Sequence, residues 1–208
     1  MTCAINFDVI DGGEARLEEQ ASSILQTLVP GEAGQQWHVF RTRPRCEKKA
    51  AEQFDEMRLG HYLPVREQVS RRKGRRYSSL LPLFPGYLFG CCDTGQRLRA
   101  MRGGYLSQWL DVKDQQTLLL ELRDICVASV RGTGVELYPQ LCRGKWVKVV
   151  RGPLEGIRGR ISRRKENYRI VLGLTAMQSA VAVEVEMQDV EIDDTVGTDG
   201  LSRFAVVD

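Results

Sequence analysis

Apolar residues recur at helical spacing in four parts of the chain. Leu17, Ala21, Ile24 and Leu28 are separated by four, three and four positions, which places them on one face of an amphipathic helix. The same spacing, with charged residues on the opposite face, predicts three more helices. The predicted helices are residues 14–29, 46–59, 96–101 and 115–130.

Short runs of bulky or alternating apolar residues between these helices predict strands. Pro64 indicates an edge position, because proline donates no backbone hydrogen bond. Residues 71–76 form a basic sequence that we expect to be a hairpin loop turning at Gly74. The predicted strands are residues 37–40, 62–69, 77–81, 87–89 and 105–112. From residue 37 onward the order β-α-β-β-β-α-β-α predicts an α+β sandwich, with helices packed on a mostly antiparallel sheet.

The pattern changes after Gly132, Gly134 and Pro139, which mark a domain boundary. Five short strands within about fifty residues are typical of a small β-barrel. These strands are residues 145–149, 158–162, 168–172, 181–185 and 190–192. The predicted organisation is an N-terminal extension (1–36), an α+β domain (37–131), a linker (132–141), a β-barrel domain (142–193) and an acidic flexible tail (194–208).

The distribution of charge is more informative than the formal net charge of +3. Residues 37–110 carry a net charge of +9 and residues 140–169 carry +8, whereas residues 1–36 carry −5 and residues 170–208 carry −7. Clustered lysine and arginine are typical of proteins that bind phosphate groups. The alternative for either block is an ordinary solvated surface.

Several classes of protein do not fit this sequence. No secretory signal or apolar stretch of membrane-spanning length is present, so we expect a cytoplasmic protein with reduced cysteines. The six cysteines include no C-x-x-C pair, and the carboxylates show no metal-site spacing. The two histidines, His38 and His61, stand in no catalytic motif. We therefore expect no metal, no cofactor and no enzymatic activity.

The region from residue 144 to residue 161 combines alternating strand positions with regularly placed glycines. Glycine is needed where the backbone takes positive φ or passes close to another strand. The region resembles the KOW motif, through Gly144, Gly152, Pro153, Gly156 and Gly159. A generic SH3-like barrel, in which these residues serve only the turns, is the alternative. The resemblance implies an SH3-like KOW barrel.

The sequence from Pro82 to Phe89, PLFPGYLF, is similar to the signature of the NusG N-terminal (NGN) domain. Its position upstream of a KOW-like region resembles the NusG family, over roughly residues 37–193. This resemblance implies an NGN α/β sandwich and a monomeric elongation or antitermination factor that binds RNA polymerase and suppresses pausing or termination. The long N-terminal extension is similar in kind to what a specialised, RfaH-like paralogue would add.

The family resemblance also implies interaction sites, by position. An apolar patch for the β′ clamp helices of the polymerase, with contact to β left open, would include Phe84, Pro85, Tyr87 and Phe89. The alternative is that some of these side chains point into the core. Arg41 departs from the resemblance, because NGN domains commonly carry an aromatic or apolar residue at this position of the first strand.

Two further sites follow from the resemblance. Contacts to the non-template DNA strand would come from Arg43, Arg45, Lys48, Lys49 and Arg102. A solvated helix face is the alternative for these residues. Leu154 and Ile157, beside the Gly152-Pro153 turn, would contact ribosomal protein NusE or the termination factor Rho as exposed apolar residues. The alternative is that Leu154 folds back onto the barrel.

Two other functions fit parts of the sequence. A KOW-type RNA-binding protein of the ribosomal kind would bind structured RNA without polymerase. A DNA-binding regulator would need a helix-turn-helix or similar reader, and the sequence has no such signal.

Overall fold

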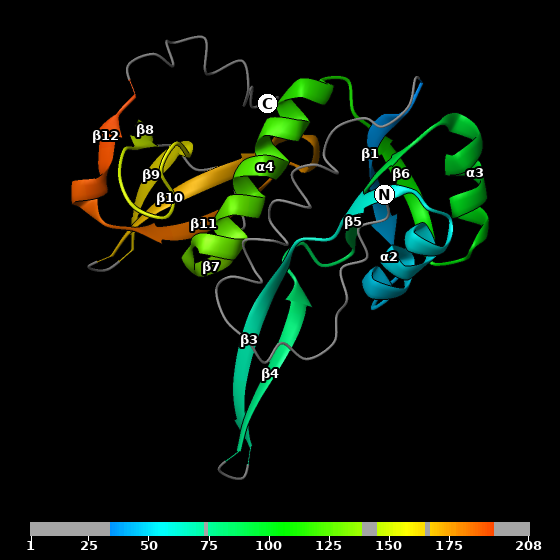
Figure 1. Cartoon of the computed structure of the whole chain (residues 1–208), viewed down its shortest axis with the longest axis horizontal. Helices are drawn as coiled ribbons and strands as arrows, with labels where there is room; N and C mark the ends of the chain where they lie inside the picture. The colour runs from blue at the N-terminus through cyan, green and yellow to red at the C-terminus, as the bar shows by residue number, and fades with distance from the viewer. Residues whose placement is uncertain (1–33, 73–74, 139–144, 165–166, 194–208) are drawn as a thin grey trace. The chain divides into compact units, whose positions relative to one another are not determined.

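The computed structural model describes residues 34–72, 75–138, 145–164 and 167–193 (Figure 1). The predicted helix at 14–29 and the predicted tail at 194–208 lie outside these residues. The chain divides into two compact units, Met1–Leu119 and Leu120–Asp208. Each unit is described separately below.

The first unit contains a four-stranded antiparallel sheet in the order β2-β5-β1-β6. Its strands are β2 (Gly60–Tyr62), β5 (Tyr87–Cys92), β1 (Gln36–Thr42) and β6 (Leu106–Asp111). Two helices, α2 (Glu47–Glu56) and α3 (Thr94–Arg102), contribute to the hydrophobic core with strands of this sheet. The expectation of helices packed on an antiparallel sheet is confirmed for this unit.

The core of the first unit follows from the apolar face of α2. Ala50, Ala51 and Phe54 are fully buried, and the Phe54 ring meets the Phe40 ring edge-on at 5.2 Å between centroids. Burying such side chains removes about 25 cal/mol of unfavourable hydration per Å² of apolar surface. Helix α3 begins with a capping box, in which Asp93 accepts from the Gln96 backbone and Gln96 accepts from the Asp93 backbone.

The remaining two strands of the first unit, β3 (Val65–Arg72) and β4 (Arg75–Pro82), form a separate two-stranded ribbon. Figure 1 shows this ribbon extending away from β5. The expected loop at residues 71–76 is shorter than predicted, because Arg71 and Arg72 pair with Arg76 and Arg75 in the strand ladder. Charge alone does not prevent strand pairing, since the backbone makes the hydrogen bonds.

Helix α4 (Gln115–Arg131) begins in the first unit and continues into the second. Asp114 precedes it and accepts a hydrogen bond from the Thr117 backbone at 2.9 Å, which satisfies one of the free N–H groups of the first turn. Within the second unit, Leu122, Ile125 and Cys126 of α4 are fully buried. Helix α4 ends at Arg131, one residue beyond the predicted end at residue 130.

The second unit contains a six-stranded antiparallel sheet in the order β12-β8-β9-β10-β11-β7. In the part of the chain that the structure describes, β12 and β7 are edge strands that do not pair with each other, so a closed barrel is not confirmed. The strands are β7 (Thr133–Tyr138), β8 (Trp146–Val149), β9 (Arg158–Arg164), β10 (Asn167–Leu174), β11 (Ser179–Val185) and β12 (Val190–Ile192).

Strand β7 differs from the linker expected at 132–141. Glu136 and Leu137 pair with Ala182 and Val181 of β11. Gly134, with φ of +62°, lies where the β7–β11 register shifts. Gly134, which was interpreted as a linker residue, thus accommodates an irregular edge strand.

Candidate partner and nucleic-acid interface

The Pro85-Gly86 turn is held by hydrogen bonds on both sides of its glycine. Gly86 takes φ of +85°, which favours glycine, and its backbone N–H donates to Glu47 Oε1 at 2.8 Å. Its carbonyl accepts from the Thr42 backbone N–H at 2.8 Å. The turn that resembles the NGN signature is therefore fixed to the end of β1 and to the first residue of α2.

The four residues predicted for polymerase binding divide into two pairs. Phe84 and Phe89 are 2% and 0% exposed, and their rings meet edge-on at 6.2 Å. Pro85 is exposed and Tyr87 is half-buried. In this conformation only Pro85 and Tyr87 of the predicted set offer surface to a partner.

Arg41 completes the accessible surface at this turn. It is the cross-strand partner of Tyr87, and its guanidinium lies 6.0 Å from the centroid of the Tyr87 ring. Arg41 is exposed, so the pair presents a cation beside an aromatic face. We call Arg41, Pro85 and Tyr87 the turn patch. The sequence marked Arg41 only as a departure; its pairing with Tyr87 depends on the β1–β5 register.

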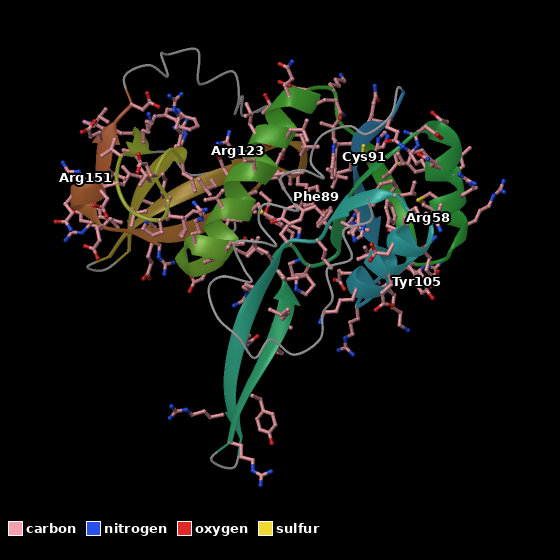
Figure 2. All side chains as sticks on the ribbon, in the orientation of Figure 1. Arg58, Phe89, Cys91, Tyr105, Arg123 and Arg151 are labelled. Atoms are coloured by element: carbon pink, nitrogen blue, oxygen red, sulfur yellow. The ribbon has the colours of Figure 1, made fainter. Side chains whose placement is uncertain are left out.

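The predicted nucleic-acid residues come from two separate segments that the fold brings together. The backbone N–H of Arg43 donates to the carbonyl of Tyr105 at 2.8 Å, and Gln53 Nε2 donates to the carbonyl of Ala100 at 2.9 Å. These bonds join the β1–α2 connection and the second half of α2 to the end of α3 and the residues after it, and Figure 2 shows Tyr105 beside α2. We call the five residues the basic patch: Arg43, Arg45, Lys48, Lys49 and Arg102.

The basic patch is open to solvent. Lys48 is half-buried and the other four residues are exposed. Arg45 has φ of +62°, an uncommon backbone conformation for a residue other than glycine. Because Thr42 and Glu47 both bond to Gly86, the turn patch and the basic patch adjoin the same β1–α2 connection.

The glycines of the KOW-like region occupy positions that require them. Gly152 and Gly156 have φ of +85° and +89°. A Cβ atom at Gly159 would lie 2.6 Å from the carbonyl oxygen of Val171, which is closer than real Cβ contacts come. Pro153 follows Gly152 and is exposed, and Gly144 lies outside the described residues.

Leu154 and Ile157 are 4% and 2% exposed, so the expectation of exposed side chains is wrong and the alternative, in which Leu154 folds back, is the one observed. The turn folds back because Gly156 N–H donates to the Val149 carbonyl and Val149 N–H donates to the Ile157 carbonyl, each at 2.9 Å. Leu154 nevertheless lines an open groove of about 420 Å³. Its other lining residues include Pro153, Tyr168, Met187 and Asp189.

The second unit also contains two arginine–aromatic pairs. The Arg160 guanidinium lies 5.1 Å from the Trp146 ring centroid, and that of Arg163 lies 5.5 Å from the Tyr168 ring centroid. Both are cross-strand neighbours. No sequence motif marks them, because the pairs exist only once the strand register is known.

The buried titratable groups of the first unit serve its packing. Burial lowers the pKa of His61, whose Nδ1 lies 3.3 Å from the Leu59 carbonyl oxygen. Burial raises the pKa of the Cys92 thiol to about 12. Among the described residues no group of three or more His, Cys, Asp or Glu side chains could hold a metal ion. No described helix is long and apolar enough to cross a membrane.

Comparison with known proteins finds a family that part of the chain resembles. A family model described as transcription termination factor NusG matches residues 35–117. No curated protein matches the chain. Among solved structures, a chain in a crystal structure of the MjSpt4:Spt5 complex (conformation B) is similar, with 15% sequence identity. The match covers 75% of this chain and 95% of that chain, with a TM-score of 0.26. The region from residue 35 to residue 117, which holds the four-stranded sheet, the ribbon, α2 and α3, is therefore similar to the NusG family of transcription factors.

Proposed function

We propose that this protein is a monomeric cytoplasmic elongation and antitermination factor that binds RNA polymerase through its first unit. The observation that carries the proposal is the NusG family match over residues 35–117, which spans both the turn patch and the basic patch. By stabilising one state of the polymerase clamp, such a factor suppresses pausing or termination without chemistry of its own.

The turn patch is the proposed contact for the β′ clamp helices, and the polymerase β subunit is a further contact that the resemblance leaves open. Tyr87 is an anchor of the kind that dominates binding energy, since aromatic and arginine side chains are enriched at hot spots. Arg41 beside it adds a cation that can meet carboxylates of a partner. Phe84 and Phe89 would then support the patch from within the core.

The basic patch is the proposed contact for the non-template DNA strand. Five basic side chains at one end of α2 and α3 can follow a phosphate backbone. Such binding weakens steeply with salt, because each phosphate contact releases counterions.

The second unit is the proposed KOW domain, which recruits NusE or Rho. Its groove beside Leu154 gives a partner side chain access to an otherwise buried residue. Met187, which is 53% exposed, lies on the groove and is the type of adaptable apolar contact found at binding surfaces. We further propose that the protein is a specialised, RfaH-like paralogue.

Retention of the purified chain on an immobilised β′ clamp-helix fragment tests the polymerase contact. We expect Tyr87→Ala and Arg41→Ala to reduce retention. Tyr77→Ala is the matched control, because Tyr77 is an exposed tyrosine of the same unit outside the turn patch. Phe84→Ala is unsuitable, since emptying a buried site costs about 3–5 kcal/mol of stability. Equal retention of all variants would overturn the proposed contact.

In vitro transcription on a template with a pause site and a Rho-dependent terminator tests the activity. The proposed function requires that wild-type protein shorten the pause or increase readthrough. It also requires that Tyr87→Ala lose this effect while Tyr77→Ala keeps it. A protein that binds the clamp fragment but leaves both sites unchanged would not be an antitermination factor.

The arginine–aromatic pairs of the second unit favour RNA binding of the ribosomal KOW kind as a second candidate function. Arginine planes and aromatic rings stack on unpaired RNA bases. This candidate requires tight binding to structured RNA in the absence of polymerase, with a loss on Arg160→Ala. Binding to the clamp fragment that is unaffected by Arg160→Ala distinguishes the two functions.

A further inference from the structure

Helix α3 presents an exposed face that is basic and carries one large apolar side chain. Leu98 is 48% exposed, and Arg99 and Arg102 are also exposed. Leu98 and Arg102 are four residues apart, so they lie one turn apart on the same side of the helix. We call Leu98, Arg99 and Arg102 the α3 face. Because Thr94–Arg102 contains no acidic residue, no carboxylate of the helix itself offsets these charges.

The arginines of the α3 face also lack a carboxylate partner in the part of the chain that the structure describes. Arg97, the third arginine of the helix, forms a salt bridge with Asp111 at 3.0 Å. Arg99 and Arg102 form none among the described residues. A single exposed leucine is ordinary on a protein surface. A leucine that lies beside two such arginines fits a partner that carries both an apolar stripe and carboxylates.

The sequence before the described residues has this complementary composition. The N-terminal extension carries a net charge of −5. Residues 14–29, which we call the N-terminal segment, are predicted to form an amphipathic helix whose apolar stripe includes Leu17 and Ala21. Glu14 and Glu18 precede these two residues by three positions, which places both carboxylates beside the stripe of such a helix.

The chain enters the described structure beside α3. Gln35 Nε2 donates to Gln96 Oε1 of that helix at 3.3 Å. The chain from residue 29 to residue 35 can span up to about 20 Å, whereas a helix of nine residues such as α3 is only about 14 Å long. The N-terminal segment can therefore reach any turn of α3, and Pro30-Gly31 in the connection favours a reversal of direction.

We propose that the N-terminal segment docks on the α3 face, with its apolar stripe against Leu98 and its carboxylates beside Arg99 and Arg102. The short connection gives the segment an effective concentration on the order of millimolar, so a weak contact is sufficient. Attraction between exposed opposite charges weakens as salt rises. The N-terminal segment fits better than an external acidic protein, because Gln35 already holds its connection against α3.

Docking lowers the affinity of the first unit for nucleic acid, and this consequence rests on the proposed function. Arg102 belongs both to the α3 face and to the basic patch. A docked acidic segment therefore covers one proposed phosphate contact and repels a DNA strand from the basic side chains nearby. The N-terminal segment acts as an intramolecular competitor, and a DNA strand or another partner has to displace it.

Hydrogen exchange of the full chain measures docking in the absence of DNA. We expect the amides of the N-terminal segment to exchange at least about tenfold more slowly than those of an unprotected chain. Isolated helices of about this length are marginal in water, so an undocked segment exchanges nearly freely. The protection should be lost at about 1 M salt. Protection that grows with protein concentration would show that a second copy docks on α3, which would overturn the proposal.

Charge reversal on α3 tests which surface the segment occupies. Arg99→Glu with Arg102→Glu should remove the protection of the N-terminal segment. The matched control is Arg71→Glu with Arg75→Glu, which reverses two exposed arginines on the β3–β4 ribbon of the same unit and should keep the protection. Absence of protection in the wild-type chain, or protection that survives reversal of Arg99 and Arg102, would overturn the proposal.

A compensating change separates loss of docking from damage to α3. Glu14→Arg with Glu18→Arg, added to the reversed α3 face, restores opposite charges on the two surfaces and should restore the protection. A reversed helix that has merely unfolded would not recover in this way. Failure of the compensating variant, with α3 itself still protected from exchange, would contradict the assigned charge pairing.

Fluorescence anisotropy of a labelled, mixed-sequence single-stranded DNA tests the competition. Glu14→Gln with Glu18→Gln should tighten binding about tenfold, because tenfold protection leaves the basic patch accessible for about a tenth of the time. The control is Glu155→Gln with Glu191→Gln, which removes the same charge from exposed positions of the second unit. Equal DNA affinity of the two variants would overturn the competition.

The two measurements distinguish failure of this inference from failure of the proposed function. A chain whose variants all fail to bind DNA, but whose N-terminal segment is protected, would contradict the basic patch and support the docking. A chain that binds DNA through the basic patch, but whose N-terminal segment exchanges freely, would support the proposed function and overturn the docking.

Discussion

At the scale of single residues, Glu47 links local sequence to the interface. It is the first residue of α2, where a carboxylate interacts favourably with the helix dipole. It is also 9% exposed and accepts the Gly86 N–H at 2.8 Å. One side chain therefore stabilises both the helix start and the turn that presents Pro85 and Tyr87.

Replacing Glu47 tests this link. Glu47→Ala leaves the Gly86 N–H without its acceptor, and we expect the free energy of unfolding to fall by about 1–3 kcal/mol. Glu47→Gln keeps an acceptor oxygen and should lose less. Urea denaturation measures the change, with the exposed Glu52→Ala on the same helix as control. Equal stability of Glu47→Ala and Glu52→Ala would show that the bond contributes nothing.

Two glycines of the second unit should respond differently to the same substitution. At Gly156 a Cβ meets nothing within 4 Å, so Gly156→Ala suffers only the positive φ, a cost of about 1–2 kcal/mol. At Gly159 the Cβ would meet the backbone of Val171, which cannot rotate away as a side chain can. We expect Gly159→Ala to lower the melting temperature more than Gly156→Ala. The reverse order would contradict the close approach of β9 and β10.

At the scale of elements, β7 is held to the second unit by an ion-pair network as well as by backbone pairing. Arg169 of β10 is 8% exposed and donates to Glu136 of β7 at 2.9 Å and to Glu184 of β11 at 3.0 Å. The hydrogen bond that Arg169 donates to the Glu136 carboxylate is the largest contribution that raises the pKa of Arg169. The network thus connects three strands across the edge of the sheet.

Arg169→Met keeps much of the apolar stem and removes the charge. Since Glu136 and Glu184 are partly exposed, we expect a loss of about 1–3 kcal/mol, less than for a fully buried pair. Hydrogen exchange should show lost protection in β7 before the rest of the sheet. Arg163→Met, an exposed arginine of β9, is the control. Protection of β7 that survives Arg169→Met would mean that backbone pairing alone holds this strand.

At the scale of the whole molecule, the two units should respond oppositely to acid. Burial lowers the pKa of His38 and His61 below the ordinary value, so the unfolded first unit takes up protons before the folded one. Its stability falls as the pH drops below about 6.5. Burial raises the pKa of Asp124 in the second unit to about 6. The folded carboxyl there takes up its proton first, so stability rises as the pH falls from about 7 to 4.

Calorimetry at about pH 7.5 and 5.5 should therefore show that acidification lowers the melting temperature of the first unit and raises that of the second unit, each by a few degrees. Asp124→Asn should remove the upward shift, while Glu155→Gln, at an exposed carboxyl of the same unit, should not. His61→Gln should reduce the downward shift. Burial also raises the pKa of Asp55, which acts in the opposite direction on the first unit, and His61→Gln separates the two effects. A shift of both melting temperatures in the same direction would contradict the assignment of opposite pH effects to the two units.

The sequence by itself determined the elements whose signal is local. The apolar face of α2, the Asp114 start of α4 and the glycine positions at 152 and 156 follow from periodicity, capping and backbone sterics, which neighbouring residues decide. The family resemblance at Pro82–Phe89 is likewise a property of adjacent residues, and the NusG match over residues 35–117 agrees with it.

Only the tertiary structure decided what depends on pairing between distant segments. It buried Leu154, Phe84 and Phe89, paired Arg41 with Tyr87, and made a strand of residues 133–138. Exposure is set by what packs against a residue, and an edge strand such as β7 needs only a partner backbone, so neither is written in local spacing. The two Arg–Arg pairs of the β3–β4 ladder belong to the same class, because a one-residue change of register would leave only one of them.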